Sequence, residues 1–254
     1  MLYERRVRRM PQQAARPEPS PGGCVGEHDQ DERRAVLEGL DELRIFPLPS
    51  SVLIPGGHLP LHVFEPRYRR MIADALAGDR VLGVALLAPG WEASYQGRPP
   101  IVESLGAGYI QSAECLPDGR YNILVHGVTR ARVIEELETG LPFRRVRAVP
   151  VEDVSIPGER ESLLAASRTL RQLVVDLAAV LPDNAAAPLA AACVRESDPG
   201  KLADLVGAAV LVDHRLRQEF LEETRPVRRL EWVSETVAQV LLQVSRGSGG
   251  GYLM

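Results

Sequence analysis

The sequence predicts an α+β fold in which a β-rich half precedes a helical half. Residues 41–153 are dense in Pro, Gly, β-branched residues and short apolar runs, a composition typical of short strands. From residue 154 onward, apolar residues recur every three to four positions, as in amphipathic helices. The pair Asp118-Gly119 between two apolar runs predicts an antiparallel hairpin. We therefore expect a mainly antiparallel β-barrel with one inserted helix, followed over residues 154–244 by a helical bundle.

The first elements of the β-rich half are short and interrupted by prolines. Runs 43–48 and 59–64 read as strands, and their prolines predict positions at sheet edges or bends. Between them and the next strand, Pro66–Leu76 predicts a helix, because proline suits the first turn and the apolar residues fall on one face. The run Val81–Leu87 is apolar throughout, so we expect a strand buried on both faces.

The hairpin is the clearest local signal in this half. Tyr109–Leu116 and Tyr121–Val128 flank the Asp-Gly pair and should form neighbouring antiparallel strands. Two further strands are expected at 133–137 and 143–151.

The helical half has recognisable helix boundaries. A long amphipathic helix is expected from about residue 158 until Pro182 ends it, and a short one around 188–194. Asp198 before Pro199 has the signature of an N-cap followed by proline in the first turn. Pro226 begins the last predicted helix.

Both ends of the chain are predicted to lack a packed structure. Residues 1–40 are expected to form a disordered or weakly ordered extension, and residues 245–254 a flexible Gly/Ser tail. The basic N-terminus is followed by prolines and not by an apolar segment, which argues against a signal peptide. No stretch reaches the ~18 apolar residues of a membrane helix. We expect a cytoplasmic protein without a membrane partner.

Charge and cysteine content narrow the classes of partner. A net charge of −4 and an isoelectric point near 5.8 make nucleic acid an unlikely partner, since no long-range positive field attracts phosphate. Cys24, Cys115 and Cys193 are odd in number and far apart, which predicts free thiols in a reducing compartment.

Motifs for ATP hydrolysis and Ser-Lys proteolysis are missing from the sequence. The sole lysine, Lys201, follows Gly200, but Arg195 stands where a P-loop needs its first glycine and Leu202 where it needs a hydroxyl. The same lysine would have to serve as a catalytic base, and the first turn of a helix is a poor place to desolvate it.

The remaining candidates for chemistry are weak. Cys115 and His126 could form a nucleophile pair across the hairpin, but Cys115 is more simply a small strand residue. Pro60 between His58 and His62 prevents the helix that would align them as metal ligands. We expect no catalytic residue, cofactor or metal site.

Several strings follow one another along the sequence: Phe46-Pro47-Leu48-Pro49, Val52-Leu53-Ile54-Pro55-Gly56, Leu59 to Tyr68 (LPLHVFEPRY), Leu116 to Arg132 (LPDGRYNILVHGVTRAR) and Asp198 to Leu205 (DPGKLADL). In this order they resemble the Lon substrate-binding domain family, and above all its stand-alone bacterial members. The similarity covers about residues 43–242. It departs at Gly56-Gly57-His58 and at Ser104 to Gly108, where the match is loose.

The resemblance implies a PUA-like β-barrel with a helical part, and binding of unfolded or exposed protein segments for a proteolytic machine. Full-length Lon carries an ATPase and a Ser-Lys protease after this domain, whereas this sequence ends, so we expect a non-catalytic binding module. A separate protease or chaperone is a candidate partner. The apolar residues of the proline-rich stretch are the predicted peptide-binding site: Phe46, Leu48, Ile54, Leu59, Leu61, Phe64 and Tyr68.

RNA binding is the alternative function, because PUA-like folds are known to host it. The arginines concentrated in the β-rich half are its candidate site: Arg130, Arg132, Arg144, Arg145 and Arg147. A solvated sheet face balanced by Glu135, Glu136 and Glu138 is the simpler interpretation. An enzyme is the third hypothesis, and it would need a pocket with convergent titratable groups.

Overall fold

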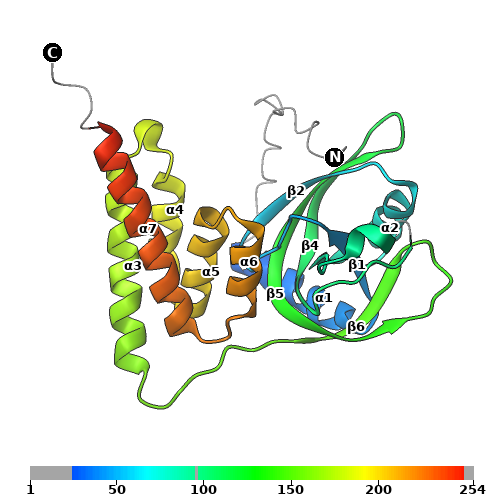
Figure 1. Ribbon diagram of the computed structural model, residues 1–254, viewed down its shortest axis with the longest axis horizontal. Helices are drawn as coiled ribbons and strands as arrows, with labels where there is room; N and C mark the ends of the chain where they lie inside the picture. Colours follow the sequence, from blue (N-terminus) through cyan, green and yellow to red (C-terminus); the bar gives the residue numbers. More distant parts are fainter. Residues whose placement is uncertain (1–24, 95–96, 249–254) are drawn as a thin grey trace.

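The protein has an α+β architecture in which a β-rich part and a helical part lie side by side (Figure 1). The computed structural model describes residues 25–94 and 97–248. Within them the chain forms one mixed six-stranded sheet and seven α-helices. Helices α5 and α6 lie between the β-rich part and the α3–α7 pair (Figure 1). Among the described residues, no helix is both long and apolar enough to cross a membrane.

The sheet is mainly antiparallel and curls so that its pairings form a ring. Its strands are β1 (Leu43–Leu48), β2 (His58–Val63), β3 (Val81–Leu86), β4 (Ser104–Cys115), β5 (Tyr121–Leu137) and β6 (Arg144–Pro150). They follow the order β2-β5-β4-β3-β1-β6, and β6 also pairs with β5. The pair β1–β3 is parallel, whereas the pairs β1–β6, β2–β5, β3–β4, β4–β5 and β5–β6 are antiparallel. β2 lies outside the ring, where it pairs with β5 as an edge strand.

The predicted hairpin is confirmed. β4 and β5 pair antiparallel, and the turn places Gly119 at a φ of 77°. The backbone N–H groups of Leu116 and Gly119 donate to the carbonyls of Arg120 and Leu116, respectively. Only the glycine adopts the left-handed conformation, and Asp118 instead accepts from the Arg120 N–H with its side chain.

Two predictions about the other strands need correction. The edge position predicted for both proline-containing runs is confirmed for β2 but not for β1, which β3 and β6 flank; β6 pairs only with Leu43 to Ile45, so Pro47 lies beyond that ladder and is tolerated. The strand predicted at 133–137 is not separate. It is the end of β5, which continues through an irregularity between Val133 and Glu135. The fully buried strand is confirmed as β3, and the inserted helix as α2 (Pro66–Ala77).

The prediction of disorder up to residue 40 is also wrong for its second part. Helix α1 (Val25–Glu38) and a 3-10 turn (Gly39–Glu42) precede β1. Val36 and Leu40 are 0% and 3% exposed and pack with Leu43 and Ile45 in one apolar cluster. Two buried apolar side chains are enough to hold this segment against the sheet, because the sheet supplies the rest of the apolar surface in the cluster. Residues 1–24, also predicted to be disordered, lie outside the described residues.

The helical part comprises α3 (Arg160–Val180), α4 (Ala187–Arg195), α5 (Pro199–Val210), α6 (His214–Glu222) and α7 (Pro226–Ser248). The Asp198 cap is confirmed, since its carboxylate accepts from the Lys201 backbone N–H. Helix α6 was not predicted, although Asp213 caps it and Phe220 is fully buried. α7 extends to Ser248, which corrects the tail predicted from residue 245, and residues 249–254 lie outside the described part.

The segment between β1 and β2 connects the two parts of the molecule. Ile54 is 0% exposed and belongs to the apolar core of the helical part. The backbone of this segment crosses β4 and β5 where both carry glycine. A Cβ on Gly106 would lie 1.9 Å from the Leu53 carbonyl oxygen, and one on Gly127 would lie 2.3 Å from that of Ile54. Only glycine permits this close backbone approach.

A buried ion network joins the same two parts. Both Oδ atoms of Asp204 on α5 accept from the Arg130 guanidinium of β5 at 2.6 Å. Arg229 of α7 is fully buried, and its Nε lies 3.4 Å from Asp204. The other two nitrogens of Arg229 donate to the Asp153 carboxylate at 2.8 and 2.7 Å. Two arginines thus share the buried Asp204, and each has a further polar partner.

Gly106→Ala should destabilise the protein by about 1–3 kcal/mol, because the new methyl group must push the Leu53 backbone away from β4. Chemical denaturation measures the change. Gly97→Ala is the matched control, since its Cβ would find its nearest atom, the Ser94 carbonyl, at 3.6 Å. Equal stability of the two variants would show that the segment is not packed against β4 in this way.

Asp204→Ala should cost about 3–5 kcal/mol in the same denaturation experiment, because it leaves the buried guanidinium of Arg130 without its carboxylate. Glu135→Ala is the control: Glu135 pairs with Arg147, and both side chains are about half exposed, at 49% and 51%. Exposed pairs of this kind contribute about 0–1 kcal/mol. A loss from Asp204→Ala no larger than that of the control would contradict a stabilising network.

Candidate functional site

A groove lies between the end of β1 and the segment that leads from β2 into α2. Its volume is about 170 Å³, and eleven residues line it: Phe46, Pro47, Leu48, Pro49, Ser50, Ser51, Leu61, His62, Phe64, Glu65 and Tyr68. Five of the seven residues predicted to bind peptides are therefore brought together here. They come from two stretches of the chain, residues 46–51 and 61–68, and the connection between β1 and β2 brings these stretches together.

The predicted residues contribute differently to this groove. Phe46 and Tyr68 are each 6% exposed, and their ring centroids lie 4.5 Å apart, so they form its floor. Leu48 and Leu61 are half-buried at its sides. Phe64 is 51% exposed, a large fraction for an aromatic side chain. The groove therefore combines a rigid apolar base with an accessible ring.

Two predicted residues lie elsewhere. Ile54 is fully buried in the core of the helical part, where it cannot contact a ligand without unfolding. Leu59 is half-buried on β2 and packs against the apolar cluster of the β-rich part, away from the groove lining. Both were singled out as apolar residues of a proline-rich stretch, and composition alone cannot separate core residues from groove residues.

Polar groups surround the Tyr68 ring. The Arg67 guanidinium lies over it at 4.5 Å from the centroid, and its Nε donates to Glu65 at 3.0 Å. The Glu65 side chain precedes α2 but makes no capping hydrogen bond to its N-terminus, and it pairs with Arg67. Burial raises the pKa of Tyr68 to about 12, so its hydroxyl stays protonated and can donate a hydrogen bond even in moderately alkaline solution.

Most of the arginines considered for RNA binding are paired with acids. Arg130 is buried against Asp204. Arg144 pairs with Glu136, Arg145 with Glu42 and Asp74, and Arg147 with Glu135. Phosphate would have to compete with these carboxylates, which disfavours a strong electrostatic interface at this surface.

The nucleophile and histidine pairs considered from sequence do not form. On the β4–β5 ladder, Cys115 is opposite Tyr121 whereas His126 is opposite Tyr109, so Cys115 and His126 are separated by most of the hairpin. His62 contacts Asn122 through Nδ1, and His58 contacts Gln111 through Nε2. Their ligand atoms are thus directed to different partners.

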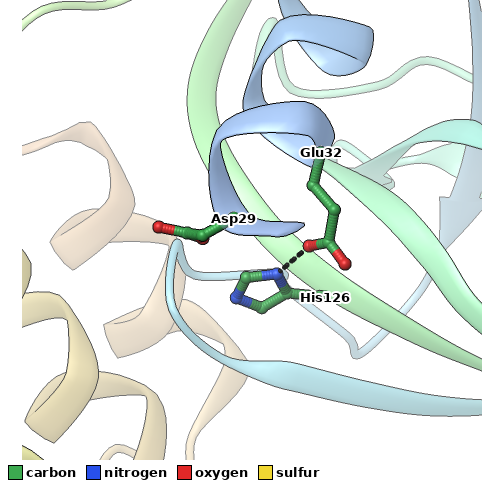
Figure 2. A group of neighbouring side chains, drawn as sticks. All are labelled: Asp29, Glu32 and His126. Carbon is green, nitrogen blue, oxygen red and sulfur yellow. Dashed lines mark hydrogen bonds and ion pairs between the residues drawn. The ribbon is translucent and has the colours of Figure 1, made fainter. Parts of the chain in front are cut away.

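A cluster of titratable side chains that the sequence did not predict lies where α1 meets β5. Asp29, Glu32 and His126 each place one potential ligand atom within 4.8 Å of the others (Figure 2). Glu32 contacts His126 at 2.6 Å between Oε2 and Nδ1. Burial and the neighbouring His126 ring, stacked at 4.9 Å, lower the pKa of His58 beside the cluster.

The cluster was missed because α1 was predicted to be disordered. Glu32, Val36 and Leu40 are spaced by four residues, which is the helical signal that could have revealed it.

Comparison with known proteins identifies the family. Residues 42–239 match the ATP-dependent protease La (LON) substrate-binding domain. The chain belongs to this family. The match covers both the β-rich and the helical part, and begins just after α1.

Relatives of the chain include complete Lon proteases. It is 31% identical over 196 residues to Lon protease of Solibacter usitatus, which covers 76% of this chain but 23% of that protein. The same identity holds over 195 residues to Lon protease 2 of Myxococcus xanthus, again over 76% of this chain and 23% of the relative. The chain thus spans about a quarter of the length of these relatives, and the family match is to the substrate-binding domain rather than to a protease domain.

The fold is also shared with a solved structure, the N terminal domain of Mycobacterium avium complex Lon protease. The TM-score is 0.59 at 19% identity, over 78% of this chain and 98% of that one. At this identity the likeness supports the Lon substrate-binding fold and nothing finer.

Proposed function

We propose that this Lon substrate-binding domain protein binds exposed or unfolded segments of other proteins in the groove beside β2. One observation carries the proposal: Phe46, Leu48, Leu61, Phe64 and Tyr68 line a single groove in which an aromatic ring is left half exposed. Apolar surface of this kind is buried in folded proteins, so a groove of apolar side chains selects segments that have lost their own core.

The size of the groove favours side chains as its occupants. A volume of about 170 Å³ is below the roughly 300–1,000 Å³ typical of small-molecule sites. It accommodates one or two apolar side chains of an extended segment. Ser50, Ser51, His62 and Glu65 at its margin supply polar atoms that can satisfy the backbone of such a segment.

The position of β2 adds a second mode of contact. It pairs with β5 on one side and is the end strand of the sheet, so an extended client segment can align with its other side. Pro60 interrupts the row of backbone N–H donors on this strand. Insertion of side chains into the groove therefore contributes more affinity than strand addition.

The finer architecture belongs to the same proposal. The ring of pairings among β5, β4, β3, β1 and β6 supports a PUA-like barrel, and the side-by-side packing of α3 and α7 supports a C-terminal bundle (Figure 1). A protein of this kind is non-catalytic and presents its clients to a separate protease or chaperone. The missing P-loop in the sequence agrees with this role.

RNA binding remains the function that a direct experiment must exclude. The observation in its favour is the concentration of arginines on β5 and β6, of which Arg132 is exposed. The carboxylate partners of Arg144, Arg145 and Arg147 weigh against it.

Phe64→Ser should weaken binding of a fluorescently labelled, permanently unfolded polypeptide by about tenfold or more, as expected for loss of an aromatic anchor. The wild-type affinity should change little between low and high salt, because apolar contact is not screened by ions. Fluorescence anisotropy measures both. The same polypeptide in its folded form should bind more weakly.

Ile134→Ser is the matched control, since Ile134 is 57% exposed on β5 and does not line the groove. Both variants should have the stability of the wild type. If the two variants bind the polypeptide with equal affinity, the polypeptide binds outside the groove. Tight binding of RNA that collapses in salt, together with no polypeptide binding, would establish the alternative function.

A further inference from the structure

We propose that Asp29, Glu32 and His126 form a binding site for one divalent transition-metal ion, with Zn²⁺ as the ion that the donor set fits best. The three side chains place potential ligand atoms within 4.8 Å of one another. Figure 2 shows Glu32 directed onto the imidazole, with Asp29 on the same stretch of α1. The site lies outside the groove, and the proposal does not depend on the function proposed for that groove.

The donor set is suited to zinc. One imidazole nitrogen and two carboxylate oxygens are frequent Zn²⁺ ligands, and sites with three protein ligands leave a further position for water. Asp29 and Glu32 are three residues apart on a helix, which places both on one face. Their two negative charges balance the charge of the ion.

Neighbouring side chains hold two of the ligands in place. Gln111 donates from Nε2 to the Glu32 Oε1 atom at 3.0 Å, which leaves Oε2 directed at His126. The ring of His58 stacks on His126 with centroids 4.9 Å apart, and the His58 Nε2 atom contacts Gln111. Support of ligands by a second layer of hydrogen bonds is a common property of metal sites.

Little movement is needed to close the site. Zinc lies about 2.0–2.2 Å from nitrogen and oxygen ligands, so the ligand atoms must approach to roughly 3.3 Å. Glu32 and His126 are already 2.6 Å apart and need to separate slightly around the ion. Asp29 is exposed, and rotation of its side chain brings its carboxylate closer.

A cavity next to the cluster supplies room for the remaining ligands. It measures about 220 Å³, and both Asp29 and His126 line it. Its opposite wall comes from Lys201 and Leu205 on α5 and from Glu196, which follows the end of α4. A bound ion therefore faces a space with a mixed polar and apolar lining between the β-rich and the helical part, open to water or to an oxygen donor of a bound molecule.

A bound ion would link α1 to the part of the chain that matches the family. Helix α1 precedes residues 42–239, which match the family, whereas His126 lies within them on β5. Coordination from both sides couples zinc binding to the docking of α1, since a ligand that binds only the docked state stabilises that state.

The test is a zinc titration of the full chain by isothermal calorimetry after removal of metal with a chelator. One Zn²⁺ should bind per chain, and Co²⁺ should give visible absorption bands of a bound ion. Asp29→Asn and Glu32→Gln should each weaken zinc binding by about 100-fold, because each removes one anionic ligand from a three-ligand site. Zn²⁺ should also raise the melting temperature of the wild type but not of these variants.

Asp31→Asn is the matched control, because it removes a carboxylate from the same helix. Asp31 is 67% exposed, pairs with Arg34 and does not line the cavity. Its zinc affinity should equal that of the wild type. No zinc binding by the wild type, or binding that Asp29→Asn and Glu32→Gln leave unchanged, would overturn the proposal. Circular dichroism of the variants verifies that α1 remains folded.

Discussion

The buried pairing of Arg130 with Asp204 is the interaction on which the arrangement of the two halves depends. It removes the guanidinium of β5 and the carboxylate of α5 from water together. A buried pair of this kind is stable only when the two groups are well aligned and their remaining donors and acceptors are hydrogen-bonded. Arg229 adds a second guanidinium beside the same carboxylate and is itself held by Asp153, in the connection between the sheet and the helices. The relative position of the two halves is therefore specified by directional contacts and not by apolar packing alone.

The contact between the two halves also positions the groove, because the segment that follows β1 takes part in both. Ile54 is anchored in the helical core, and Arg217 of α6 donates to the Val52 carbonyl at 3.0 and 3.2 Å. The residues just before this anchor, Leu48 to Ser51, form one wall of the groove. Because the helical half holds one end of that wall and β1 holds the other, the groove is largely formed before a client arrives. A preformed apolar site loses less conformational entropy on binding than a flexible one.

The local elements could be predicted from sequence, whereas the tertiary roles of single residues could not. Asp118-Gly119 and Asp198-Pro199 specify a turn and a helix start through their own backbone preferences, and both predictions are confirmed. Arg130 was grouped with surface arginines because its partner Asp204 is distant in sequence and no local pattern reveals it. Ile54 was assigned to the binding site for the same reason, since only the fold shows that it belongs to the helical core. The Asp29, Glu32 and His126 cluster depends on helix α1, whose buried apolar pattern consists of Val36 and, in the 3-10 turn that follows, Leu40; this pattern is too short to outweigh the polar composition around it.

If the groove beside β2 is the surface that binds clients, hydrogen–deuterium exchange of the full chain with and without a saturating unfolded polypeptide will show it most directly. The backbone amides of residues 46–51 and 61–68, which carry the groove, should gain protection when the polypeptide is bound. The amides around Arg144 to Arg147 should not change. Protection confined to β6, or to α3 and α7, with none at the groove, would show that clients bind elsewhere.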